Sequence, residues 1–152
     1  MASSDDPRLR VTFPETQVSA IAELDPTAAP QTVAGVIAAL PLAGTAGHAI
    51  YSGSEIMFFI PPTVWLPAEN ATSRVLPGDL GYYRFRGGAH YGFPDDVAEL
   101  CWFYDRDATP SMPDGPVRVN IFGRFTEGWT EFAAACRAMR SEGAQSVRVD
   151  LA

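Results

Sequence analysis

Apolar and polar residues alternate in short segments along most of this chain. In residues 8–13, Leu9, Val11 and Phe13 fall on one side, with arginines and a threonine on the other. Successive side chains of a β-strand point to opposite faces, so this period of two is typical of a strand with one buried face. Similar alternation or a short apolar run marks residues 18–24, both arms of a hairpin within 44–61, and residues 80–86, 99–104, 117–121 and 146–151. The sequence therefore predicts a mainly β chain of about seven or eight strands.

Two segments follow the period of a helix instead. Residues 30–40 carry apolar side chains at helical spacing, begin at a proline and end before Pro41. A second helix is expected to end at Gly143, with Thr126 as a candidate N-cap. Its apolar stripe consists of Trp129, Phe132, Cys136 and Met139. We therefore expect two helices, one near each end of the chain.

Composition excludes two classes of partner. The formal net charge is −7 with only 11 basic residues, whereas nucleic-acid binding is driven by basic side chains that release counterions from phosphates. No apolar run approaches the roughly 20 residues that span a bilayer, and the first residues, MASSDDPR, hold neither a basic nor an apolar leader region. We expect a soluble, cytoplasmic protein that binds neither nucleic acid nor membrane, with a disordered tail over residues 1–7 and one domain over residues 8–152.

The sequence shows no metal or cofactor motif. Cys101 and Cys136 lie far apart, without the spacing of a metal knuckle or a redox pair, and both fall in apolar segments that favour buried, reduced thiols. With only 2 histidines, no spacing supplies the three or four ligands of a metal site. Neither a phosphate-binding glycine loop nor a serine-nucleophile elbow is present. We expect neither a metal nor a cofactor.

The two histidines are candidates for acid–base chemistry near neutral pH. His48 lies in an apolar strand segment, where it is either a histidine satisfied inside or at the rim of the domain or a group that faces a ligand. His90 lies in a glycine-rich loop, which either covers a ligand or is only solvated. Both histidines are therefore candidate site residues.

A hairpin brings a carboxyl near His48. Ser52 and Gly53 are interpreted as a two-residue turn, which places His48 opposite Met57. Glu55 follows this turn and either orients the imidazole of His48 or is an exposed hairpin carboxylate.

The strand at 80–86 offers aromatic and cationic groups in succession. Strand alternation sends Tyr82 and Arg84 to one face and Tyr83 to the other. A guanidinium beside a tyrosine suits a carboxylate or planar amide ligand, whereas the alternative is a surface arginine stacked on an aromatic ring.

The order of the expected strands and helices, and the sequences of several segments, resemble those of the cyclophilins. The segment AELDPTAAPQTVAGVIAALP at 22–41 resembles the cyclophilin strand end that leads through Ala-Pro-x-Thr-Val into the first helix. The segments LPLAGTAGHAIYSGSE, PGDLGYY and ELCWFY are similar to an uncharacterised bacterial family of small cyclophilin-like proteins, a domain of unknown function. The resemblance implies a closed cyclophilin-like β-barrel of about eight strands with a helix at each open end. It also implies a homo-oligomeric ring, for which a hexamer is one arrangement.

The resemblance does not extend to prolyl isomerase chemistry. Isomerases of this fold use an arginine on a Phe-His-Arg segment and a downstream glutamine, but the corresponding region here reads GHAIYSGSEIMFFI. His48 is the only remnant. Because one placed donor is typically worth about a hundredfold in rate, residual peptidyl-prolyl isomerase activity is only the third functional hypothesis.

The leading hypothesis is binding of, or action on, a small polar molecule such as a carboxylate or an amide. Its site would lie between the 44–57 hairpin, the 80–86 strand and the 87–96 loop, and would consist of His48, Tyr51, Glu55, Tyr82, Arg84 and His90. In any reaction, His48 would be the general acid or base, Glu55 its orienting group and Arg84 an anion clamp. The alternative is a structural or interaction subunit of a homo-oligomeric ring, with interface or core aromatics at Trp65, Phe93 and Trp102.

Overall fold

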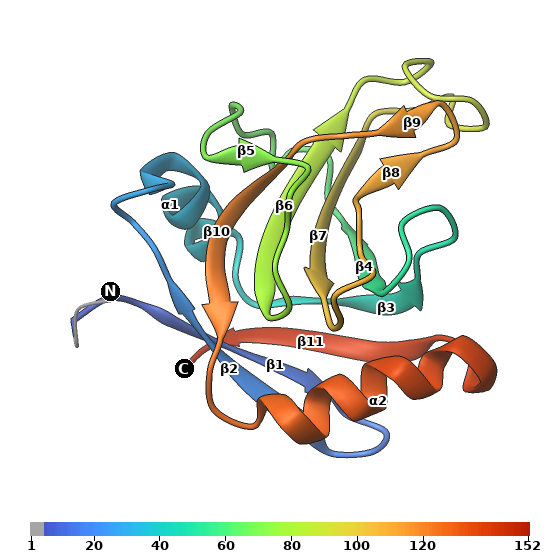
Figure 1. Ribbon diagram of the computed structural model, residues 1–152. Helices are drawn as coiled ribbons and strands as arrows, with labels where there is room; N and C mark the ends of the chain where they lie inside the picture. The colour runs from blue at the N-terminus through green and yellow to red at the C-terminus, as the bar shows by residue number, and fades with distance from the viewer. Residues whose placement is uncertain (1–4) are drawn as a thin grey trace.

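Eight antiparallel strands close into one barrel in the computed structural model, which describes residues 5–152 (Figure 1). Around the barrel they follow the order β2 (Val18–Leu24), β1 (Arg8–Phe13), β11 (Gln145–Leu151), β3 (Leu42–His48), β4 (Glu55–Ile60), β7 (Val97–Phe103), β6 (Asp79–Phe85) and β10 (Val119–Phe125). Pairing of β10 with β2 closes the ring, and the start of β10 also pairs with the short β5 (Ala71–Thr72). A separate hairpin consists of β8 (Ser111–Met112) and β9 (Gly115–Pro116). The predicted mainly β barrel is confirmed.

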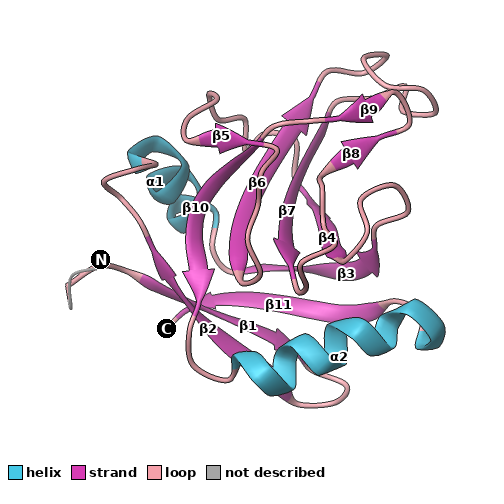
Figure 2. Cartoon of the chain, in the orientation of Figure 1, coloured by secondary structure: helices cyan, strands magenta, loops and turns pink. Residues whose placement is uncertain are grey.

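Two helices complete the fold (Figure 2). Helix α1 (Pro30–Ala39) begins at a proline, which needs no partner for a missing N–H at the first helical position. Helix α2 (Trp129–Glu142) packs against β2 and β3 and ends at Gly143, as predicted. The predicted cap at Thr126 is wrong. Gly128 is the N-cap, with a φ of 77°, and a Cβ there would lie 2.7 Å from the Ser19 carbonyl oxygen, so a tight chain approach defines this helix start.

The interior of the barrel is centred on Trp102, which is fully buried. The rings around it are Phe13, Phe58, Phe125 and Phe132. The indole N–H donates to Cys136 Sγ at 3.3 Å, so α2 is joined to the barrel core by both ring packing and a polar contact. Trp102 therefore belongs to the core, and its alternative assignment to an interface was wrong. Cys101 and Cys136 are both buried free thiols, as expected.

A second apolar layer lies on the outside of the barrel. Because side chains alternate, the residues of β4, β7, β6 and β10 that do not face the interior form this layer, which includes Met57, Cys101, Phe103, Tyr83 and Val119. Ala108 and Val117 pack on it from the chain segment 104–118, which includes the β8–β9 hairpin. The outer face of these strands is therefore a covered surface, and it is where ionisable side chains become buried.

The hairpin register differs by one residue from the prediction. His48 lies opposite Ile56, not Met57, and the Ala49 N–H donates to the Glu55 carbonyl, so residues 49–54 form a longer connection. The expected two-residue turn does not form because Ser52 bonds across to Ser111 instead of turning the chain locally. A shift of one residue exchanges the faces on which opposed side chains lie.

The N-terminal tail predicted over residues 1–7 is only partly described by the structure. Residues 1–4 of the predicted tail lie outside the described residues, and the Pro7 carbonyl accepts a hydrogen bond from the Leu24 N–H. Neither helix within residues 5–152 has the length and apolar character needed to cross a membrane.

The packing of α2 on the barrel gives a first prediction. Phe132→Ala removes a fully buried ring that stacks on Phe13 at 4.8 Å, so we expect a loss of about 3–5 kcal/mol in the free energy of unfolding. Urea denaturation followed by tryptophan fluorescence measures the loss. Tyr91→Ala in an exposed loop is the control and should change stability by less than about 0.5 kcal/mol. Equal effects of the two variants would contradict this account of the core.

Candidate functional site

A pocket of about 170 Å³ opens on the outer face of β4 and β7. Its walls are mainly apolar and consist of Ile50, Met57, Phe59, Phe85, Phe93 and Met112. Its polar lining comes from His48, Tyr51, Ser52, Glu55, Glu99 and Ser111. Of the predicted site residues, His48, Tyr51 and Glu55 are thus brought together here. A concave, mostly apolar pocket with a few convergent polar groups is the usual form of a small-molecule site.

Two carboxyl groups lie deep in this pocket. Glu55 of β4 is 4% exposed and Glu99 of β7 is 8% exposed. Both point outward from the barrel, because their strand neighbours Ile56 and Leu100 face the interior. A carboxyl oxygen of each lies within 4.8 Å of the other and of Cys101 Sγ. Glu55 Oε1 is buried without a hydrogen-bond partner among residues 5–152, so one acceptor of this carboxyl is left unsatisfied.

Burial makes both carboxyls weak acids. Desolvation raises the pKa of Glu55 to about 7, against a smaller opposing effect of the nearby Ser52 side chain. Desolvation and the nearby Glu55 charge raise the pKa of Glu99 well above its usual value. Burial and both carboxylates also raise the pKa of the Cys101 thiol. Near neutral pH the site therefore holds protons that it can exchange, as general acid–base catalysis requires.

The same three groups could hold a metal ion. Two carboxylate oxygens and a thiolate are ligands that Zn²⁺ accepts. Sequence spacing could not indicate this set, because Glu55 comes from one strand and Glu99 and Cys101 from another. The expectation of a metal-free protein stays a prediction.

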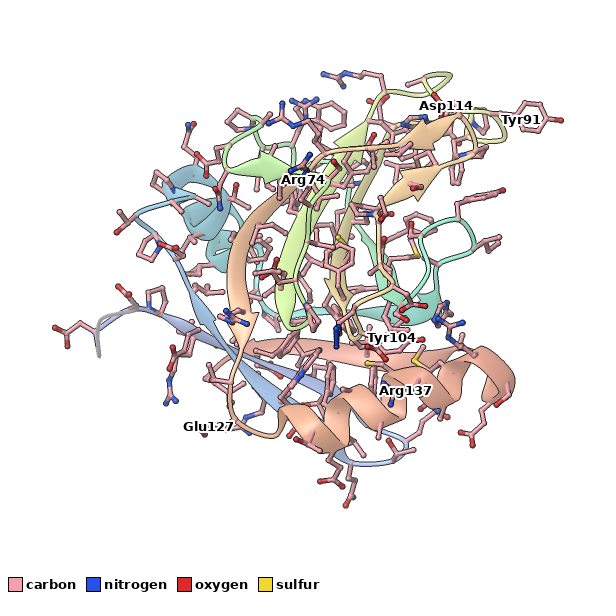
Figure 3. All side chains as sticks on the ribbon, in the orientation of Figure 1. Arg74, Tyr91, Tyr104, Asp114, Glu127 and Arg137 are labelled. Atoms are coloured by element: carbon pink, nitrogen blue, oxygen red, sulfur yellow. The ribbon has the colours of Figure 1, made fainter. Side chains whose placement is uncertain are left out.

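His48 is held by a chain of hydrogen bonds at the edge of the pocket. The Ala49 carbonyl can only accept, so His48 Nδ1 donates to it at 2.8 Å. In the neutral ring, Nε2 then accepts from the Tyr104 hydroxyl at 2.8 Å. That hydroxyl in turn accepts from Arg140 Nε at 2.6 Å. Tyr104, which lies beside Arg137 next to α2 (Figure 3), is therefore the group that orients His48, a role that the sequence assigned to Glu55.

His90 has an equivalent arrangement beside the pocket. Its Nδ1 donates to the Asp114 carboxylate at 2.9 Å, so neutral Nε2 accepts from the Tyr83 hydroxyl at 2.9 Å. Burial, with the charges of Glu99 and Asp114, raises the pKa of Tyr83 to about 12, so this hydroxyl remains a proton donor. The imidazole packs on the edge of Phe85, which lines the pocket, but His90 does not line it. Asp114 fastens this loop to the β8–β9 turn (Figure 3).

Tyr82 and Arg84 lie outside this pocket. Tyr82 is buried in the barrel, where its hydroxyl donates to the Val64 carbonyl and accepts from the Leu66 N–H. Arg84 Nε donates to the Leu66 carbonyl and its guanidinium lies 4.6 Å from the Trp65 ring. Strand alternation explains the separation, since Tyr83 and Phe85 occupy the opposite face of β6. The predicted six-residue site is therefore divided between two regions.

Sequence reasoning missed Glu99 and Tyr104. Glu99 is the single charged residue in the apolar segment ELCWFY, and a charge within a buried strand is the signal that could have identified it. Tyr104 ends the same segment, but its contact with Arg140 joins elements far apart in the chain.

The fold is that of the cyclophilin-like barrels, as the resemblance implied. The Mimivirus cyclophilin superimposes with a TM-score of 0.54 at 11% identity, over 98% of this chain and 89% of that one. A hypothetical protein from Archaeoglobus fulgidus has a TM-score of 0.57 at 27% identity, over 97% and 95%. McbB, solved in complex with tryptophan, has a TM-score of 0.69 at 16% identity over 93% of this chain, which spans only 43% of McbB.

The chain belongs to the family described as "Protein of unknown function (DUF3830)", whose model matches residues 11–151. This agrees with the predicted membership of an uncharacterised family with a cyclophilin-like fold. Among curated proteins, none shows significant sequence similarity to the chain. The expected homo-oligomeric ring stays a prediction.

The two histidine arrangements predict one tautomer. When neutral, both rings should carry the proton on Nδ1, because a carbonyl and a carboxylate accept from that atom. Two-bond ¹⁵N–¹H correlation spectra can assign this directly, since the chain has only 2 histidines. Tyr104→Phe should change the signals of His48 alone and Tyr83→Phe those of His90 alone, so each variant is the control for the other. An Nε2 proton in either wild-type ring would contradict the assignment.

The raised pKa of Glu55 predicts a pH-dependent stability. Below about pH 4.5 the Glu55 carboxyl is neutral in both the folded and the unfolded protein. Above about pH 7 the folded protein contains its charge in a buried position. The free energy of unfolding should therefore fall as the pH rises from about 4.5 to about 7. A pKa shift from 4.5 to about 7 corresponds to about 3 kcal/mol. Glu55→Gln should therefore gain stability relative to wild type between about pH 5 and pH 8 in urea denaturation.

Glu15 provides a control of opposite sign. The hydrogen bond from the Ser146 N–H lowers the pKa of this exposed carboxyl. The contribution of Glu15 to stability is therefore lost only at acid pH. Between about pH 5 and pH 8, the free energy of unfolding of Glu55→Gln should rise relative to wild type. That of Glu15→Gln should not. If the difference in free energy of unfolding between Glu55→Gln and wild type did not change with pH in this range, a raised pKa of Glu55 would be excluded.

Proposed function

We propose that this protein binds a small molecule with a basic amine and an apolar body, and that Glu55 exchanges a proton with it. The observation that carries the proposal is Glu55 itself, a buried carboxyl with an unpartnered oxygen at the base of an apolar pocket. An ammonium group would donate to that oxygen and neutralise the buried charge.

The charges around the pocket favour a cation. Glu55 and Glu99 both line it, whereas no arginine does among the described residues. The rings of Phe59, Phe85 and Phe93 form walls that suit an apolar body and can also face a cation. A carboxylate ligand, although expected from the sequence, has no cationic partner among the described residues of this pocket, because Arg84 lies elsewhere and ionised Glu55 would repel a second carboxylate.

Proton transfer is the chemistry that this geometry supports. Ionised Glu55 can take a proton from the bound ammonium, which leaves a neutral amine with a free lone pair, and can return the proton in a later step. With a pKa of about 7, the carboxyl is populated in both forms at neutral pH. Both ring nitrogens of His48 are bonded within the protein, to Ala49 and Tyr104, so the proton transfer is assigned to Glu55 alone.

The comparison with McbB supports the choice of a first probe. Tryptophan, which that protein binds, combines an aromatic body with an ammonium group. At 16% identity the likeness establishes the fold alone, so the amine proposal rests on the carboxyls of this chain.

Calorimetry with phenethylamine tests the proposal. At about pH 8 the amine should bind, whereas phenethyl alcohol and phenylpropionate, which keep the ring and replace the ammonium, should bind about tenfold more weakly or not at all. Near pH 7 binding should release protons, measured in buffers of different ionisation enthalpy, because the ligand favours ionised Glu55.

Variants of the pocket carboxyls, compared with a control variant elsewhere, test whether the amine binds at this site. Glu55→Gln should abolish the proton release, and both it and Glu99→Gln should weaken amine binding about tenfold. Glu142→Gln, at the exposed end of α2, is the control and should leave binding unchanged. Equal binding of the amine and the alcohol, or an unaltered affinity in Glu55→Gln, would overturn the proposal.

A further inference from the structure

A second pocket, of about 120 Å³, lies beside β6 and is bordered by two arginines. Arg84 comes from β6 and Arg118 from the residue just before β10. Its lining is completed by Leu66, Ala68, Tyr82, Tyr83 and Asn120. Two arginine residues therefore border one small space in a protein whose net charge is −7.

The strand register explains why this space exists. The β6–β10 ladder has Asn120 opposite Tyr82 as its last pair at this end. Two residues further along the same register, Arg118 would lie opposite Arg84. Like charges directly opposite each other destabilise a strand pair, and the ladder ends before that position. The start of β10 pairs with β5 along its other edge, at Val119 and Asn120, so on the β6 side the ladder stops at Asn120 and both arginines lie beyond its end.

Neither arginine has a carboxylate partner among residues 5–152. Arg84 donates to the Leu66 carbonyl and Arg118 to the Ala71 carbonyl. Ion pairs are otherwise common for arginine in this protein, and join carboxylates to Arg8, Arg86, Arg137, Arg140 and Arg148. Each guanidinium has five N–H donors, so most of the donors at this pocket are free.

The other polar groups of the pocket are already satisfied. Asn120 donates to the Thr32 hydroxyl and the Pro67 carbonyl and accepts from the Glu69 N–H. The Tyr82 hydroxyl also has both partners inside the protein. The donors left for a ligand therefore belong to the two arginines. Trp65 lies against the Arg84 guanidinium and restricts its plane, which leaves the edges of that group free to bond.

We propose that Arg84 and Arg118 together bind one small oxyanion, a carboxylate or phosphate group. Paired oxygens match the planar fork of a guanidinium, and one anion between the two arginines would remove their mutual repulsion. The volume accommodates such a group with few additional atoms. This site is separate from the amine pocket and does not depend on the function proposed there.

Titration with sodium phosphate and, separately, with sodium acetate tests the site. Chloride keeps the ionic strength constant, and NMR follows the Arg84 and Arg118 Nε–H signals and the Trp65 indole signal. We expect saturable shifts of these signals with at least one of the two anions. Saturation with acetate alone identifies a carboxylate site, saturation with phosphate alone a phosphoryl site, and saturation with both a general oxyanion site.

Matched variants make the result specific. Arg84→Met and Arg118→Met should each weaken binding about tenfold or more, because each removes charge-assisted hydrogen bonds. Arg148→Met removes a surface arginine that already pairs with Asp150, and should leave binding unchanged. Arg84→Lys keeps the charge but not the fork and should also weaken binding, which separates lost geometry from a folding defect. Non-saturating shifts with both anions, or affinities unaltered in Arg84→Met and Arg118→Met, would overturn the proposal.

Discussion

The attachment of the 104–118 segment to the β3–β4 connection determines the character of the pocket. The Ser54 hydroxyl donates to the Asp107 carboxylate, the Ser52 hydroxyl donates to the Ser111 carbonyl, and main-chain bonds join Tyr104 and Thr109 to the same two serines. These bonds keep the segment over the outer face of β4 and β7. Without that cover, Glu55 would be solvated, and the desolvation that raises its pKa would disappear. The raised pKa of Glu55 thus depends on the hydrogen bonds that hold the 104–118 segment to Ser52 and Ser54.

Period-two and helical patterns were sufficient to predict the barrel. Residues 8–13, 18–24 and 30–39 have the structure that their spacing indicated, because each pattern reflects a single buried face. The β3–β4 register was not predictable in the same way. Gly53 does have a positive φ, which agrees with a turn, but Ser52 and Ser54 bond to residues more than fifty positions away. Local turn chemistry contains no information about such distant partners.

The candidate site was only partly predictable for a related reason. His48, Tyr51 and Glu55 come from one connection, so proximity in sequence predicted proximity in space. Glu99 joins them from β7, and Tyr104 reaches His48 from the end of the same strand, through contacts that depend on the order of strands around the barrel. Strand alternation was known from the sequence, but it could not show which face of the 80–86 strand meets the pocket. The structure shows that Phe85 lines the pocket, with the Tyr83 ring packed beside it, and that Arg84 bonds to Leu66 outside the pocket.

Tyr83 lies where the electrostatic effects of the two regions meet. The Glu99 charge raises its pKa and the Arg84 charge lowers it, while His90 and Asp114 keep its hydroxyl oriented as a donor. An anion bound at Arg84 would offset the positive charge felt by Tyr83 and would favour its neutral form further. An ammonium bound at Glu99 would act in the opposite direction. The barrel thus holds one pocket lined by two carboxyls and another bordered by two arginines, and β6 contributes residues to both.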